Sequence, residues 1–71
     1  MYLIDYLEMK NVSVKDFAEI IEVHKSTIFN YLNWNRKPNL EIALKIETAT
    51  KGKVTFRDML DYWEMGKKYG A

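Results

Sequence analysis

The sequence predicts a single all-helical domain built from five short helices. Apolar residues recur at helical spacing in five separate segments, and residues that cap or stop helices stand between them. No segment alternates apolar and polar residues for long enough to indicate a strand. At 71 residues the chain has the length of one small domain, so we expect residues 1–71 to share one core.

The first predicted helix runs from about residue 2 to residue 9. Leu3, Tyr6 and Leu7 recur at helical spacing and form its buried stripe. We expect this helix to stop at Asn11, because asparagine tolerates a positive φ better than most residues.

The second predicted helix covers residues 14–21 and belongs to the stretch around which the chain is organised. Ser13 is its N-cap, and Asp16 follows three residues later, as in a capping box. Its inner face consists of Val14, Phe17, Ala18 and Ile21.

The third predicted helix covers residues 25–32 and follows a tight turn in which Val23 points inward. Either His24 or Ser26 caps this helix. Its inner face, Ile28, Tyr31 and Leu32, packs back onto the second helix. The outer face is left exposed and carries Lys25, Ser26, Phe29, Asn30 and Asn33.

The fourth predicted helix covers residues 40–50 and follows an asparagine-rich loop over residues 33–39. Asn39 caps this helix and Gly52 ends it. Its inner face consists of Ile42, Ala43, Ile46 and Ala49.

The fifth predicted helix occupies about residues 55–66, with its helical turns over residues 56–65. Thr55 caps its start, with Asp58 three residues further along, and Gly66 stops it. We expect residues 67–71 to form a frayed tail. The apolar stripe consists of Phe56, Met59, Leu60 and Trp63.

The charges are distributed unevenly, although the net charge is only +1. Residues 1–24 hold two lysines against five acids, a balance of −3, whereas residues 25–37 hold three basic residues and no acid, a balance of +3. The basic cluster coincides with the third predicted helix and the loop after it. Local charge of this kind decides where a phosphate backbone can dock.

Several classes of function are excluded by composition. The chain has no cysteine and one histidine, so we expect no disulfide, no metal site and no cofactor. It has no phosphate-binding glycine loop, no cysteine nucleophile and no second histidine, so we expect no enzyme. It lacks an apolar run of about 18 residues and a basic leader, so we expect a cytoplasmic protein without a membrane segment.

A set of residues in the central stretch resembles the helix-turn-helix of phage repressors and Cro proteins, the XRE-like family. They are Phe17-Ala18, Val23, Ser26-Thr27-Ile28, Tyr31-Leu32 and Pro38. Residues 43–55 are similar to the end of YdaS-like members. The resemblance runs from about residue 3 to residue 60. It implies a lambda repressor-type domain of bacterial or phage origin, with its helix-turn-helix at about residues 13–33, that binds operator DNA to regulate transcription.

The resemblance also implies which residues meet the bases. Lys25, Ser26 and Asn30 match the base-reading positions of the family's recognition helix, which lies in the major groove. Lysine donates to guanine, asparagine can bond adenine through two atoms, and serine can play either part. Phe29 shares this face; it contacts a thymine methyl group, or it packs sideways on the fourth helix or a partner.

A second set of residues is predicted to contact the DNA backbone: His24, Thr27, Asn33, Arg36 and Lys37. His24 touches phosphate or fills the turn, and Thr27 contacts phosphate or holds the helix start. The basic pair Arg36 and Lys37 lies along the backbone, or else belongs to an ordinary solvated loop. Such contacts position a protein without reading sequence.

Two residues depart from the family pattern. Glu22 stands where the turn usually has glycine, and a left-handed conformation there would cost about 1 kcal/mol. Trp34 stands where the loop after the recognition helix often has glycine. It covers the core, contacts DNA sugar or meets a second subunit, and the sequence does not choose among these.

The aromatic residues of the fifth helix favour a homodimer. Tyr62, Trp63 and Tyr69 add aromatic surface, and aromatic residues are enriched at protein interfaces. The alternative is that Trp63 closes the core of the monomer. Without a separate effector domain, we expect no small-molecule effector.

A protein-interaction module is the alternative function. An antitoxin-like or adaptor subunit on the same fold would use Phe29, Trp34, Tyr62 and Trp63 as contact residues. The low net charge and Glu22 favour this alternative, whereas the basic cluster favours DNA.

Overall fold

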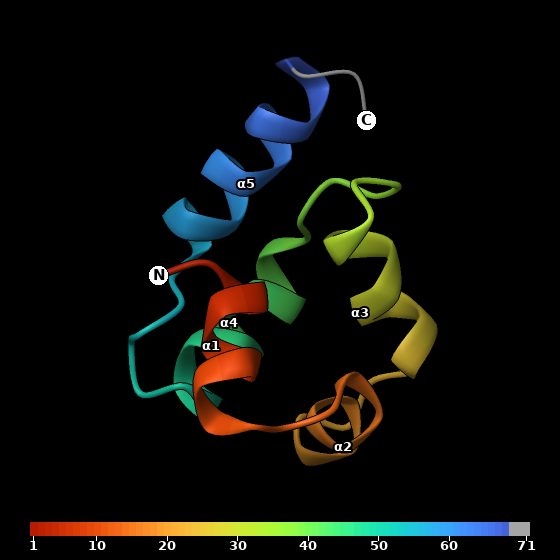
Figure 1. The fold of residues 1–71 in the computed structure, drawn as a ribbon, viewed down its shortest axis with the longest axis vertical. Helices are drawn as coiled ribbons and strands as arrows, with labels where there is room; N and C mark the ends of the chain where they lie inside the picture. Colours follow the sequence, from red (N-terminus) through yellow and green to blue (C-terminus); the bar gives the residue numbers. More distant parts are fainter. Residues whose placement is uncertain (69–71) are drawn as a thin grey trace.

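The structure is a computed structural model that describes residues 1–68 (Figure 1). Those residues form five helices and no strand, so the all-helical prediction is confirmed. The predicted bounds of the first four helices differ from the observed ones by at most one residue. The helices are α1 (Leu3–Lys10), α2 (Val14–Ile20), α3 (Lys25–Leu32), α4 (Leu40–Ala49) and α5 (Phe56–Lys68).

Side chains cap the starts of α2 and α4 as predicted. The Ser13 hydroxyl accepts a hydrogen bond from the Asp16 amide at 3.1 Å. The Asn39 side-chain oxygen accepts from the amides of Glu41 and Ile42 at 2.8 and 3.3 Å. Each cap satisfies amides that have no partner within the helix.

The start of α5 is a reciprocal capping box. The Asp58 amide donates to the Thr55 hydroxyl at 3.1 Å, and the Thr55 amide donates to the Asp58 carboxylate at 3.0 Å. The same carboxylate accepts from the Met1 amine at 2.9 Å, which joins the beginning of the chain to α5. The predicted cap is therefore confirmed, with a second partner that the sequence did not indicate.

The first four helices end in the same way, in a Schellman motif. A left-handed residue donates its amide to the carbonyl three residues back, and the next residue donates to the carbonyl five residues back. Glycine is the usual residue at the left-handed position, yet none of the four is glycine. They are Asn11, Glu22, Trp34 and Lys51, with φ between 54° and 59°.

The ends of α1 and α4 bear on two sequence predictions. Asn11 is the left-handed stop that was expected after α1. At α4 the reversal begins at Lys51, and Gly52 follows it with a φ of 80°. The glycine therefore completes the turn, while a lysine adopts the conformation that ends the helix.

The core lies where all five helices meet. Its buried apolar residues are Leu3, Leu7, Phe17, Ala18, Ile21, Ile28, Tyr31, Ala43, Ile46, Val54 and Met59. Several residues expected to point inward are only half-buried and pack at its edge: Tyr6, Val14, Val23, Leu32, Ile42, Ala49 and Phe56. The buried Thr50 hydroxyl is satisfied by backbone groups, including the Val54 amide at 3.1 Å.

The predicted stop of α5 at Gly66 is wrong, because the helix continues to Lys68. Gly66 is buried inside the helix, and a Cβ atom at this position would overlap the indole ring of Trp34. The glycine is thus a packing residue, and its conformational freedom does not end the helix. Residues 67 and 68, which were expected in the tail, are helical, and the rest of that tail lies outside the described residues.

Candidate nucleic-acid interface

The outer face of α3 gathers the four residues that were predicted to read bases. Lys25, Ser26 and Phe29 are exposed and Asn30 is half-buried. They fall on one side because their spacing follows the helical period, while Ile28 and Tyr31 bury the opposite side. The ring of Phe29 is 46% exposed, which leaves it open to a ligand. This face carries no acidic residue.

The pose of α3 depends on the turn that connects it to α2. α2 packs directly against α3, and the turn between them is the Schellman motif centred on Glu22. Glu22 adopts a φ of 59°, so it holds the conformation for which glycine is preferred. The turn keeps the geometry that a glycine would give, and the glutamate side chain is exposed.

His24 caps α3 and contacts Ser26. The Ser26 amide donates to Nδ1 of His24 at 3.2 Å, so this nitrogen is an acceptor and carries no proton. The Ser26 hydroxyl oxygen lies 2.7 Å from the same nitrogen. His24 and Ser26 are therefore held against each other at the exposed start of α3.

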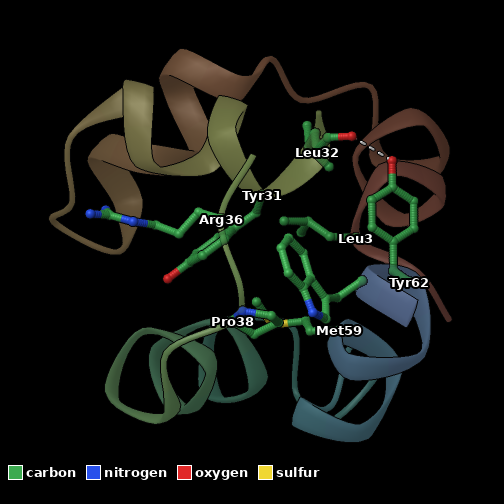
Figure 2. Close-up of a pocket in the computed structure, with 8 residues that line it drawn as sticks. Leu3, Tyr31, Leu32, Arg36, Pro38, Met59 and Tyr62 are labelled. Carbon is green, nitrogen blue, oxygen red and sulfur yellow. Dashed lines mark hydrogen bonds between the residues drawn. The ribbon is translucent and has the colours of Figure 1, made fainter. Parts of the chain in front are cut away.

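The basic residues after α3 lie in an exposed loop. Arg36 and Lys37 are both exposed, as is Asn33 at the end of the helix, while Thr27 is half-buried in its first turn. The guanidinium group of Arg36 points away from a small apolar cavity, which the stem of the side chain borders (Figure 2). Both charges are therefore free to meet phosphate groups near the end of α3.

The apolar cavity beside Arg36 is too small to bind a ligand. Its volume is about 20 Å³, which is room for one water molecule. It lies between α1, the loop after α3 and α5, and is lined by Leu3, Tyr31, Leu32, Arg36, Pro38, Met59, Tyr62 and Trp63. Within residues 1–68 no three histidine or acidic side chains lie together as metal ligands, and no helix could cross a membrane.

The residues predicted for a dimer interface make contacts within the chain. The Tyr62 hydroxyl donates to the Leu32 carbonyl at 2.7 Å, and its ring packs edge-on against Tyr2 with centroids 5.4 Å apart. Trp63 is half-buried and lines the small cavity. Tyr69, the third aromatic residue of that prediction, lies outside the described residues.

Trp34 covers the side of the core next to α5. Its ring stacks on Tyr62 with centroids 4.9 Å apart and an angle of 18° between planes. Its Nε1 donates to the Tyr62 carbonyl at 2.8 Å. Of the three positions that the sequence left open for Trp34, the structure shows packing on its own chain. Sequence periodicity does not reveal this contact, because the two residues are 28 positions apart.

Comparison with known proteins gives one family. The model of a helix-turn-helix family, HTH_3, matches residues 3–56, which is more than half of the chain and covers α1 to α4. No solved structure matches the chain.

Two curated relatives carry similar descriptions. An uncharacterized HTH-type transcriptional regulator of Haemophilus influenzae is 26% identical over 65 residues, which are 86% of this chain and 61% of the relative. The uncharacterized HTH-type transcriptional regulator YbaQ of Escherichia coli K12 is 28% identical over 67 residues, which are 89% of this chain and 59% of the relative. The chain thus spans about three fifths of the length of the curated relatives that it matches.

Proposed function

The chain belongs to the helix-turn-helix family HTH_3, and from that premise we propose that it is a sequence-specific regulator of transcription that binds double-stranded DNA. Its five helices form the lambda repressor-like fold of that family, whose members are not enzymes. Within the family we assign it to the repressor or Cro type, with residues 1–71 as one DNA-binding domain acting in the cytoplasm.

One observation carries this proposal: the exposed outer face of α3. Lys25, Ser26 and Asn30 offer donors and acceptors along one side of a short helix, and no acid interrupts them. A major groove about 12 Å wide accepts a helix and presents guanine and adenine edges that suit lysine and asparagine. Phe29 supplies an apolar surface for a thymine methyl group.

The residues around α3 suit the phosphate backbone. Arg36 and Lys37 extend from the loop at one end of the helix, and His24 is exposed at the other. Thr27 and Asn33 lie near the same two ends. Contacts at both ends would fix the register of α3 in the groove, because phosphate contacts orient a protein on the duplex.

We propose that two copies bind one operator. One molecule measures 30 × 23 × 22 Å, so its longest dimension is shorter than the spacing of about 34 Å between two half-sites on one face of the duplex. Two copies are therefore needed to occupy both half-sites. The partly exposed edges of Tyr62 and Trp63 on α5 are our candidates for the contact between copies. Sedimentation that shows only monomers at high protein concentration, with and without DNA, would refute the dimer.

The alternative is a protein-interaction module, such as an antitoxin-like or adaptor subunit. Its support is apolar surface that the fold leaves open: Ile20 is 64% exposed, and Phe29, Leu40 and Leu44 are also exposed. The net charge of +1 is low for a protein that binds DNA.

Salt dependence separates the two functions. We expect the affinity for duplex DNA, measured by fluorescence anisotropy, to fall steeply between low and physiological salt, because each phosphate contact releases counterions. The doubly substituted variant Arg36→Gln/Lys37→Gln should show a shallower slope. Lys45→Gln, on the exposed side of α4, serves as the control. Affinity that hardly changes with salt, or no binding to DNA, favours the interaction module.

A further inference from the structure

The end of α3 is joined to α5 by contacts among three residues that we call the α5 clamp: Trp34, Tyr62 and Gly66. Trp34 is the second residue beyond the end of α3, after Asn33, and its backbone adopts a left-handed conformation with a φ of 57°. The ring lies on α5, stacked on Tyr62 and hydrogen-bonded to the Tyr62 carbonyl at 2.8 Å. The chain that follows the recognition helix thus packs directly against α5.

A second hydrogen bond runs in the opposite direction. The Tyr62 hydroxyl of α5 donates to the carbonyl of Leu32, the last residue of α3, at 2.7 Å (Figure 2). The last carbonyls of a helix have no partner within it, so α5 supplies one of those that α3 lacks. Two hydrogen bonds, one from Trp34 to the Tyr62 carbonyl and one from Tyr62 to the Leu32 carbonyl, therefore fix the end of α3 relative to α5.

Gly66 makes room for this contact. It lies one helical turn beyond Tyr62, in the interior of α5, and a Cβ atom there would overlap the indole of Trp34. Glycine is a poor residue for a helix interior, because it loses more conformational freedom than alanine. Glycine is tolerated at position 66 because any larger residue would overlap the indole of Trp34.

The clamp lies between the two groups of proposed DNA contacts. Lys25, Ser26 and Asn30 precede it on α3, and Arg36 and Lys37 follow it in the loop. Because Trp34 fixes where that loop begins, it sets the distance and angle between the base-reading face and the basic loop. The family match ends at residue 56, so two of the three clamp residues lie in a part of α5 that the family model does not cover.

We propose that Trp34, Tyr62 and Gly66 are positioning residues that hold the recognition helix and the basic loop in one orientation, so that discrimination between operator and random DNA depends on α5. This inference rests on the proposed function. It makes α5 part of the DNA-reading apparatus although none of the three residues reads a base. It also assigns to α5 a task within each molecule, separate from contact between two copies.

The test compares affinity for a site that the wild type selects from randomised DNA with affinity for random duplex. Gly66→Ala pushes the indole away, Trp34→Ala removes it, and Tyr62→Phe deletes only the hydroxyl that reaches Leu32. The double variant Trp34→Ala/Gly66→Ala has no ring to displace. Asp61→Ala, on the exposed side of α5, is the matched control. All are measured at a temperature at which circular dichroism shows them folded.

We expect Gly66→Ala and Trp34→Ala each to lower the ratio of specific to random affinity by about tenfold, the loss of about one base contact. Binding to random duplex should stay within about twofold of the wild type, because phosphate contacts do not depend on sequence. The double variant should be no worse than Trp34→Ala, because both changes break the same contact. Tyr62→Phe should lower the ratio less, and Asp61→Ala should keep it.

Two results would overturn the clamp. One is that Gly66→Ala and Tyr62→Phe fold and keep the wild-type ratio, even where melting shows them to be less stable; the contacts would then serve stability alone. The other is that Gly66→Ala has the same effect with and without the Trp34 ring. Failure of the proposed function appears elsewhere, in a wild type that selects no sequence, so the two failures are distinguishable.

Discussion

Glu22 holds a conformation that a glutamate adopts at a cost. Its φ of 59° places it in the left-handed region, where the side chain of an L-residue meets the following carbonyl. We predict that Glu22→Gly raises the free energy of unfolding by about 0.5 kcal/mol, because the strain relieved, about 1–2 kcal/mol, outweighs the added entropy of the unfolded chain, about 0.5–1 kcal/mol. Urea denaturation measures this change. Glu22→Gln, which removes the charge and keeps the Cβ atom, is the control; a glycine variant no more stable than the glutamine variant would show that the turn stores no strain.

Tyr62 makes the free energy of unfolding depend on pH in the alkaline range. Burial, and then the negative charge of Asp5, raises the pKa of its hydroxyl above the ordinary value of 10.0. A raised pKa means that the folded state holds the proton more tightly, so this contribution is complete below pH 10.0 and is lost as pH rises through the folded pKa. We predict that the wild type loses stability over that range more steeply than Tyr62→Phe, measured by urea denaturation. Parallel losses in the two proteins would contradict this role of the hydroxyl.

At the scale of helices, the starts were predictable and the ends less so. A start is marked by a polar side chain just before an apolar period, and Ser13, Asn39 and Thr55 each cap the helix that they were expected to cap. An end needs only one left-handed residue, which packing can impose on a poor candidate. Trp34 is such a case, because its contacts with α5 outweigh the local preference for glycine.

The capping box of α5 makes the free energy of unfolding depend on pH in the acid range. Burial would raise the pKa of Asp58, but hydrogen bonds from Thr55 and the Met1 amine outweigh it and hold the pKa below the ordinary 3.8. A lowered pKa means that the contribution is present above pH 3.8 and is lost as pH falls through the folded pKa. We predict that Asp58→Asn costs about 1 kcal/mol at neutral pH, as other lost caps do, and that the cost shrinks in acid. Urea denaturation at both pH values measures it, with exposed Asp61→Asn as control; an equal cost at both pH values would contradict the account.

Gly66 shows why the candidate interface was easier to predict than the contacts behind it. The outer face of α3 follows from one helical period, so its residues could be named from spacing alone. Gly66 was read as a stop because glycine often ends a helix. Its actual role depends on Trp34, a residue 32 positions earlier. Contacts between residues far apart in sequence leave no periodic signal.

At the scale of the whole molecule, the five acids and the basic cluster of the first 37 positions belong to different elements. The five acids of residues 1–24 are all exposed on α1, α2 and the turn after them, whereas the three basic residues of residues 25–37 are exposed on α3 and its loop. We expect a duplex to be attracted by the basic residues of α3 and its loop, although the net charge is only +1. The same arrangement explains how so small a net charge is compatible with binding DNA.

The proposal that α3 reads base edges is tested most directly by selection from a randomised DNA library at moderate salt, with the wild type beside Asn30→Ala. We predict a palindromic consensus for the wild type, and for the variant the same consensus relaxed at one or two symmetric positions, since one base contact is worth about 1–3 kcal/mol. Asn35→Ala, in the exposed loop after α3, serves as the control and should keep the wild-type consensus. Selection of no sequence by the wild type, or an identical consensus for Asn30→Ala, would contradict this account of α3.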